Sequence, residues 1–263
     1  MSKSNFVAGI YNYCDRWCER CPYTGRCRVF HETERAEQRR RRKGQDTDSM
    51  EAAMAEVSWS FKKARRLLAR SAKSQGLNLE ELAADADQAE EAAEAEADQA
   101  ADQHPISVYA EQYTDACAKL LEKLHDAFND SADDARHRAR FMDVAEEAEH
   151  LLEVREAVEV LGWDHMLITV KIMRAIRSQQ DARREDPDLA EISLHDAAGS
   201  ASVAHRCLRR SQDALLAVYK WDEQFRDDAI GLLAKAKKLQ ADLERHIPHC
   251  LTFPWPPPEA AEA

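Results

Sequence analysis

Glycine and proline are scarce in this chain, with 7 and 8 residues respectively among 263. Folds built from strands need these residues at most of their connections, so the scarcity argues against all-β and α/β architectures. Long apolar runs are also missing. None approaches the roughly 20 residues that a membrane-spanning helix requires, and the N-terminus lacks the pattern of a secretory signal. We therefore expect an all-α protein that resides in the cytoplasm.

Lysine and arginine are absent from residues 74–118, although this segment carries 12 acidic side chains. Residues 1–73 have a net charge of +8 and residues 119–263 a net charge of −8, and these two charges cancel. The net charge of −12 of the whole chain is therefore that of residues 74–118. An acidic chain does not suit a protein whose main role is to coat nucleic acid or an anionic membrane. We expect a protein partner and no membrane partner, and we do not favour nucleic acid.

Apolar residues recur at three- and four-residue spacing over most of residues 48–247, which predicts amphipathic helices. The signals that start and end these helices are caps, turns and prolines. They lie at Asp48 or Ser49, Gly76, Asn78 to Glu81, His104-Pro105, Asn129 to Ser131, Asp186-Pro187, Asp222 and Pro248. The predicted fold is an antiparallel bundle of five or six helices.

Two of the predicted helices have unusual compositions. Residues 154–176 are apolar nearly all round, so we expect them to form the central helix, which Gly162 would kink or break. Residues 80–103 form an Ala-rich acidic helix, with ten carboxylates between positions 80 and 102. We expect Glu80, Glu81, Asp85 and Asp87 to lie against the basic half of the preceding helix, which carries Lys62, Lys63, Arg65, Arg66, Arg70 and Lys73.

The two ends of the chain differ from the predicted bundle. Residues 1–31 contain four of the seven cysteines and no clean helical stripe, so they form a small separate module. Residues 32–47 are a charged basic linker. Residues 248–263 are rich in proline and are expected to form an extended or disordered tail.

The strongest chemical signal is the cluster of four cysteines in the N-terminal module, Cys14, Cys18, Cys21 and Cys27. Four thiolates within 14 residues can converge on one point without a ligand from a distant segment. Such a set suits tetrahedral Zn²⁺ or a [4Fe–4S] cluster. The odd number of cysteines in a long helical chain fits a metal site in a reducing compartment better than a disulfide framework. Neighbouring arginines would offset the negative charge of the metal centre, namely Arg16, Arg20, Arg26 and Arg28.

The spacing leaves the identity of the metal open. Zinc is favoured, because it is the commoner structural ion and the module has the size of a small zinc-binding appendage. The bunching of three ligands with gaps of three and two residues instead suits an iron–sulfur cluster. With either metal, we expect the module to serve as a structural or interaction element.

A second class of function is an iron–sulfur redox protein or enzyme with a further site in the bundle. Carboxylates and imidazoles one helical turn apart occur in di-metal bundles. The candidate groups are Glu122 with His125, Glu147 with His150, and Asp164 and His165 with His205 and Cys207. No phosphate-binding loop or nucleophile motif accompanies them, so the sequence does not decide whether the protein is an enzyme.

A third class is a nucleic-acid-binding regulator that uses the basic N-terminal third. Aromatic residues alternate with arginines in the cysteine module, and a basic run follows at residues 39–43. Stacking aromatics beside cations are typical of RNA-binding surfaces. The alternative, which we favour, is that the aromatics pack over the small core of the module. They are Tyr11, Tyr13, Trp17 and Tyr23.

Overall fold

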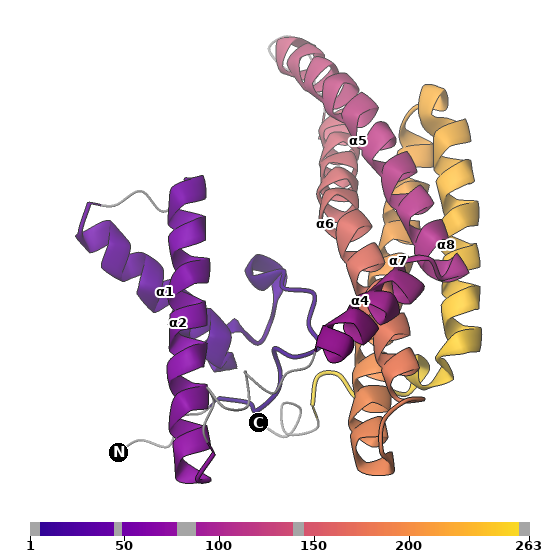
Figure 1. The fold of residues 1–263 in the computed structure, drawn as a ribbon. Coiled ribbons are helices and arrows are strands. Elements are labelled where there is room, and N and C mark those ends of the chain that lie inside the picture. Colours follow the sequence, from indigo (N-terminus) through magenta and orange to yellow (C-terminus); the bar gives the residue numbers. More distant parts are fainter. Residues whose placement is uncertain (1–5, 45–48, 78–87, 139–144, 258–263) are drawn as a thin grey trace. The chain divides into compact units, whose positions relative to one another are not determined.

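The computed structural model describes residues 6–44, 49–77, 88–138 and 145–257. Within these ranges the secondary structure is helical and no strand is present, which confirms the all-α prediction. The chain divides into two compact units (Figure 1). The N-terminal unit comprises Met1–Tyr11 and Cys18–Glu96, and the bundle unit comprises Asn12–Trp17 and Ala97–Ala263.

No helix among the described residues is both long enough and apolar enough to cross a membrane.

The N-terminal unit contains two short 3-10 turns and two described helices. The turns η1 (Cys18–Arg20) and η2 (Thr24–Arg26) precede helix α1 (Arg28–Arg42), which occupies most of the segment predicted as a basic linker. Helix α2 (Met50–Ser74) begins where Ser49 Oγ accepts a hydrogen bond from the backbone N–H of Ala52 at 3.2 Å. This confirms Ser49 as the cap. The predicted apolar stripe of α2 is exposed, at Met50, Met54, Val57, Phe61 and Leu68.

The bundle unit is built on four long helices: α5 (Pro105–Arg138), α6 (Ala145–Asp181), α7 (Pro187–Trp221) and α8 (Arg226–His246). Helix α5 packs against α6 and α8, and α7 packs against α6 and α8, so that each helix has two neighbours. Helix α4 (Gln88–Asp102) precedes them. The sequence predicted five or six helices between residues 48 and 247, and the described residues contain six there. Helix α2 belongs to the N-terminal unit, and the boundary between the two units falls within α4.

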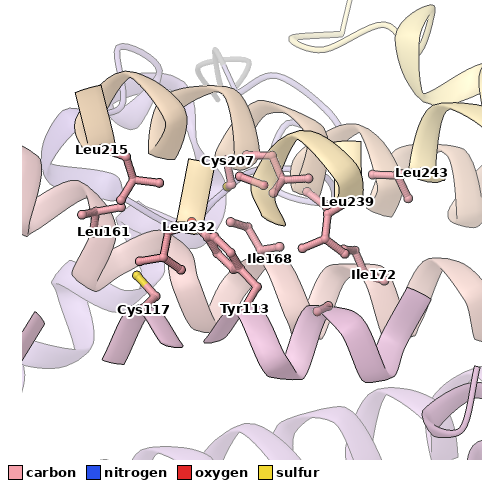
Figure 2. Packing of buried hydrophobic residues seen from close by; sticks show 14 of the residues in the cluster. Tyr113, Cys117, Leu161, Ile168, Ile172, Cys207, Leu215, Leu232, Leu239 and Leu243 are labelled. Carbon is pink, nitrogen blue, oxygen red and sulfur yellow. The ribbon is translucent and has the colours of Figure 1, made fainter. Parts of the chain in front are cut away.

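The core of the bundle lies between these four helices (Figure 2). Helix α6 contributes a fully buried stripe that includes Leu161, Ile168 and Ile172. Each such side chain stabilises the fold by about 1.5–3 kcal/mol through removal from water. Helix α7 contributes a run of small buried residues, from Ala197 to Ala204. Small side chains there bring the neighbouring backbone close, and α7 has its most extensive contacts with α6.

Most of the predicted helix boundaries are confirmed, and one is wrong. Helix α5 starts at Pro105 and α7 starts at Pro187, with Asp186 as its N-cap residue. The predicted turn at residues 129–131 is wrong, because α5 continues to Arg138. Asn, Asp and Ser lower helix propensity by only about 0.5 kcal/mol each, which is too little to end a long helix by itself. Helix α6 also runs unbroken through Gly162.

Two further predictions concern the acidic helix and the C-terminal tail. The capping box at residues 78–81 and the carboxylates at positions 80–87 lie outside the described residues. Within α4, Asp98 pairs with Arg177 of α6. After α8 the chain forms the short turn η4 (Pro248–Leu251). Phe253 and Trp255 then pack against other side chains of the bundle unit, so this part of the predicted disordered tail is held in place.

Candidate metal-binding segment and its anchorage

Three of the four clustered cysteines lie in the turns that precede α1. Cys18 opens η1, and the backbone N–H of Cys21 donates to the carbonyl oxygen of Cys18 at 3.2 Å. Cys27 is the N-cap residue of α1, and its Sγ accepts a hydrogen bond from the backbone N–H of Phe30 at 3.5 Å. The N-terminus of a helix carries partial positive charge that favours an anion beside it. All three side chains are half-buried.

The fourth cysteine, Cys14, belongs to a short strap, Asn12–Trp17, that packs on the bundle helices. The backbone of the strap is held on both sides of Cys14. Arg206 Nη2 donates to the carbonyl oxygen of Tyr13 at 2.8 Å, and Trp163 Nε1 donates to the carbonyl oxygen of Asp15 at 2.9 Å. The local backbone is therefore fixed by α6 and α7.

The surroundings of Cys14 are electropositive. Arg206 and the half-buried Lys171 both lie within electrostatic reach of its sulfur. Burial lowers the pKa of Lys171 and the pKa of Arg206, because removal from water disfavours their charged forms. Such an environment suits a metal–thiolate centre, which is anionic.

An ion-pair network continues from the strap into the interior of the bundle. Arg210 of α7 donates from Nη1 to Asp15 Oδ2 at 2.8 Å and from Nε to Asp164 Oδ2 at 2.9 Å. Its Nη2 donates to the second oxygen of Asp164. Asp164 is fully buried, and this burial raises its pKa, while the hydrogen bonds from Arg210 oppose the rise. Burial disfavours the charged form of Arg210, but Asp164 outweighs this effect and raises the pKa of Arg210.

Aromatic residues of the strap complete its attachment. Trp17 stacks on Trp163 with ring centroids 5.3 Å apart, and the guanidinium of Arg210 lies 5.0 Å from the centre of the Trp17 ring. Tyr13 donates a hydrogen bond to Asp196 Oδ1 at 3.3 Å and packs edge-on against Phe253 at 4.8 Å. These aromatics were expected to pack over a small core of the cysteine module, and they pack on the bundle instead.

A tight turn lets the strap reach all these partners. Arg16 has a backbone φ of 61°, in the left-handed region that non-glycine residues rarely occupy. Asp15 Oδ1 accepts a hydrogen bond from the backbone N–H of Trp17 at 3.1 Å across this turn. The left-handed conformation costs about 1–2 kcal/mol. The contacts of the residues on either side offset that cost.

The three cysteines outside the cluster are core residues. Cys117, Cys207 and Cys250 are buried. Burial raises the pKa of Cys117 to about 12 and the pKa of Cys250 to about 11, and it also raises the pKa of Cys207. These thiols are therefore harder to ionise than an ordinary cysteine, which makes them poorer metal ligands.

In the described part of the chain, no group of three or more His, Cys, Asp or Glu side chains is arranged so that it could hold a metal ion. Metal binding by the four clustered cysteines accordingly stays a prediction from their spacing.

The carboxylate and imidazole groups that were candidates for a second site do not come together in the described part of the chain. Glu122 and His125 are exposed, and the side chains of Glu147 and His150 lie outside the described residues. Of the third group, Asp164 pairs with Arg210, whereas the ring of His165 contacts the carbonyl oxygen of Leu161 at 3.0 Å. The ring of His205 contacts Glu244 Oε1 at 2.8 Å. Each of these three side chains has its own partner.

The strap was missed by sequence reasoning. Residues 12–17 carry no helical or strand periodicity, and their partners lie about 150 to 195 positions away. One available signal was the pair of arginines one turn apart on α7, Arg206 and Arg210, inside a segment that is otherwise rich in small residues.

In comparisons with known proteins, no family model, curated protein or solved structure matches this chain.

Proposed function

We propose that this chain is a metal-binding helical protein in which Cys14, Cys18, Cys21 and Cys27 bind one zinc ion in a structural or interaction role. A [4Fe–4S] cluster on the same ligands is the alternative. The observation that carries the proposal is the presence of four cysteines within 14 residues. The odd number of cysteines fits a reducing compartment better than a disulfide framework.

The local structure around the cysteines supports this proposal. Cys27 caps α1 and has a backbone N–H group beside its sulfur. Cys18 and Cys21 lie in a turn that a backbone hydrogen bond between them closes. Cys14 lies in a strap that α6 and α7 hold at the backbone and that two cations surround. Small cysteine modules gain their final geometry on binding, because metal binding supplies free energy of folding. We expect the sulfurs to converge when the metal binds.

The metal content of the purified protein tests the proposal. We expect anaerobically purified full-length protein to carry about one zinc ion per chain and to be colourless in visible light. A brown protein that absorbs near 400 nm would instead identify the iron–sulfur alternative. Elemental analysis together with a visible spectrum distinguishes the two.

Replacement of all four clustered cysteines by serine is expected to abolish metal binding, because a hydroxyl does not replace a thiolate ligand. The matched control is Cys117→Ala, which removes a buried thiol outside the cluster. This variant should retain the full metal content. Full metal occupancy in the fourfold serine variant would show that the ligands lie elsewhere and would reject the proposal.

A further inference from the structure

The N-terminal unit contains a pocket between its first residues and helix α1. The pocket has a volume of about 560 Å³, within the range of small-molecule sites. One wall is formed by residues 6–9 and Tyr11, and α1 forms the other with Arg28, His31, Glu32 and Arg35. The backbone N–H of Val7 donates to the carbonyl oxygen of Arg26 at 3.0 Å, which joins the first wall to η2, the turn that precedes α1.

The charge of this pocket favours an anion. Glu32 is its one carboxylate, and it accepts hydrogen bonds from Lys63 Nζ at 2.6 Å and Arg28 Nε at 3.1 Å. The bond from Lys63 lowers the pKa of Glu32, so this side chain stays ionised. Its single negative charge faces three cations, because Arg35 also lines the pocket. We expect a bound group to be negatively charged at this end of the pocket.

The pocket also offers aromatic contacts. Phe6 packs edge-on against the ring of His31, with centroids 5.6 Å apart and an interplanar angle of 89°. Among the described residues, the buried Nδ1 of His31 has no hydrogen-bond partner. This atom is enclosed in the wall of the pocket, so the rings are the part of the wall that a ligand contacts. A flat ring such as a nucleobase suits aromatic contacts of this kind.

The basic character of the pocket continues along α1. Four exposed arginines recur at intervals of seven, four and three residues, so they share one face of the helix. They are Arg28, Arg35, Arg39 and Arg42. This face extends about 21 Å from the pocket to the end of the helix, at 1.5 Å per residue. It suits an elongated polyanion better than a compact anion.

We propose that this arginine face of α1 binds single-stranded nucleic acid, with one base in the pocket beside Phe6 and Tyr11. Arg35, Arg39 and Arg42 contact successive phosphates, whereas Arg28 stays paired with Glu32, and the aromatic rings stack on the base. The proposal does not use Tyr13 or Trp17, because both are engaged on the bundle. It concerns a site within the N-terminal unit and goes beyond the proposed metal site.

Two paired substitutions on the same helix test this proposal. Arg39→Gln with Arg42→Gln removes two charges from the arginine face, and Arg40→Gln with Arg41→Gln removes two charges from the other side of α1. The probe is a fluorescent oligo-uridine of about 12 nucleotides, a length within the range of single-strand sites. Affinity of the full-length protein is measured by anisotropy over a series of salt concentrations. Oligo-deoxythymidine distinguishes DNA from RNA as the ligand.

We expect the first pair to weaken binding at low salt at least tenfold. It should also reduce the slope of log affinity against log salt by about 1.4, because each lost phosphate contact on a single strand contributes about 0.7. The control pair should leave the slope unchanged. Phe6→Leu should weaken binding about tenfold without changing the slope, since stacking does not release counterions. Circular dichroism checks that each variant keeps its helix content.

Three results would overturn the proposal: equal loss of affinity in the two pairs, preference for a duplex of the same sequence, or no binding of the oligonucleotide at low salt. Metal content is measured for each variant. Loss of nucleic-acid binding at unchanged metal content separates this site from the cysteine site.

Discussion

Replacement of Arg210 by leucine is expected to lower the free energy of unfolding by about 3–5 kcal/mol. The substitution removes both hydrogen bonds that Asp164 receives from the guanidinium. Asp164 is fully buried, so its carboxylate would be left without its cation in the interior. Leucine fills part of the same volume, and the loss therefore reports the unpaired charge more than a cavity. Denaturant unfolding followed by tryptophan fluorescence measures the effect.

The neighbouring residue provides a matched control. Arg209 is exposed on the same helix, and Arg209→Leu should change the free energy of unfolding by no more than about 0.5 kcal/mol. A second comparison replaces both members of the ion pair, as Asp164→Leu with Arg210→Leu. Removal of a whole buried pair is often neutral, so this double variant should be more stable than Arg210→Leu alone. Equal stability of Arg210→Leu and Arg209→Leu would contradict the importance of the network.

The deficit of Arg210→Leu should depend on pH. Burial already raises the pKa of Asp164, and removal of Arg210 removes the interaction that opposes the rise. A carboxyl group whose folded pKa lies above its unfolded pKa destabilises the fold as the pH increases from the unfolded value through the folded value. The deficit should therefore shrink near pH 4 and reach its full size above the folded pKa. A deficit that is constant between these limits would show that Asp164 is not its source.

The helical architecture could be predicted because it depends on local pattern. Pro105 and Pro187 mark the starts of α5 and α7 in the sequence as they do in the structure, since proline suits the first turn of a helix and cannot continue one. The sequence does not decide in the same way whether Asn129 to Ser131 form a turn or continue a helix. These residues favour turns but do not forbid a helix, because each costs only a fraction of a kcal/mol in helix propensity.

The attachment of the strap could not be predicted, because its contacts join residues that are far apart in the sequence. The cysteine spacing identifies Cys14 as one of four clustered cysteines, but no pattern in residues 12–17 predicts contacts with Arg206 or Asp196. From the sequence alone, the aromatic residues of the strap could equally well pack in a small core, stack on a nucleic acid or pack on the bundle. Only the placement of Trp163 and Arg210 on adjacent helices decides for the bundle.

Gly199→Ala is expected to destabilise the protein by about 1–3 kcal/mol through overpacking. Gly199 lies in the buried run of α7, where the ring of Tyr13 packs directly on it. A Cβ atom at this position would approach three ring carbons of Tyr13 at distances that real Cβ atoms essentially never show. The ring cannot easily move, because Asp196, His195 and Phe253 surround it. Thermal or denaturant unfolding of the full chain measures the loss.

The same substitution elsewhere in the bundle should have the opposite sign. Gly162 lies within α6, and a Cβ atom there would meet no other atom within 4 Å. Gly162→Ala should therefore stabilise the protein by about 0.5–1 kcal/mol, because alanine favours the helix and restricts the unfolded chain.

The loss of stability caused by Gly199→Ala should disappear when the ring of Tyr13 is removed. In a Tyr13→Ala background, Gly199→Ala should be neutral or stabilising, and the double-mutant cycle gives the coupling energy directly. Independent effects of the two substitutions would show that the strap does not pack on α7 at this position.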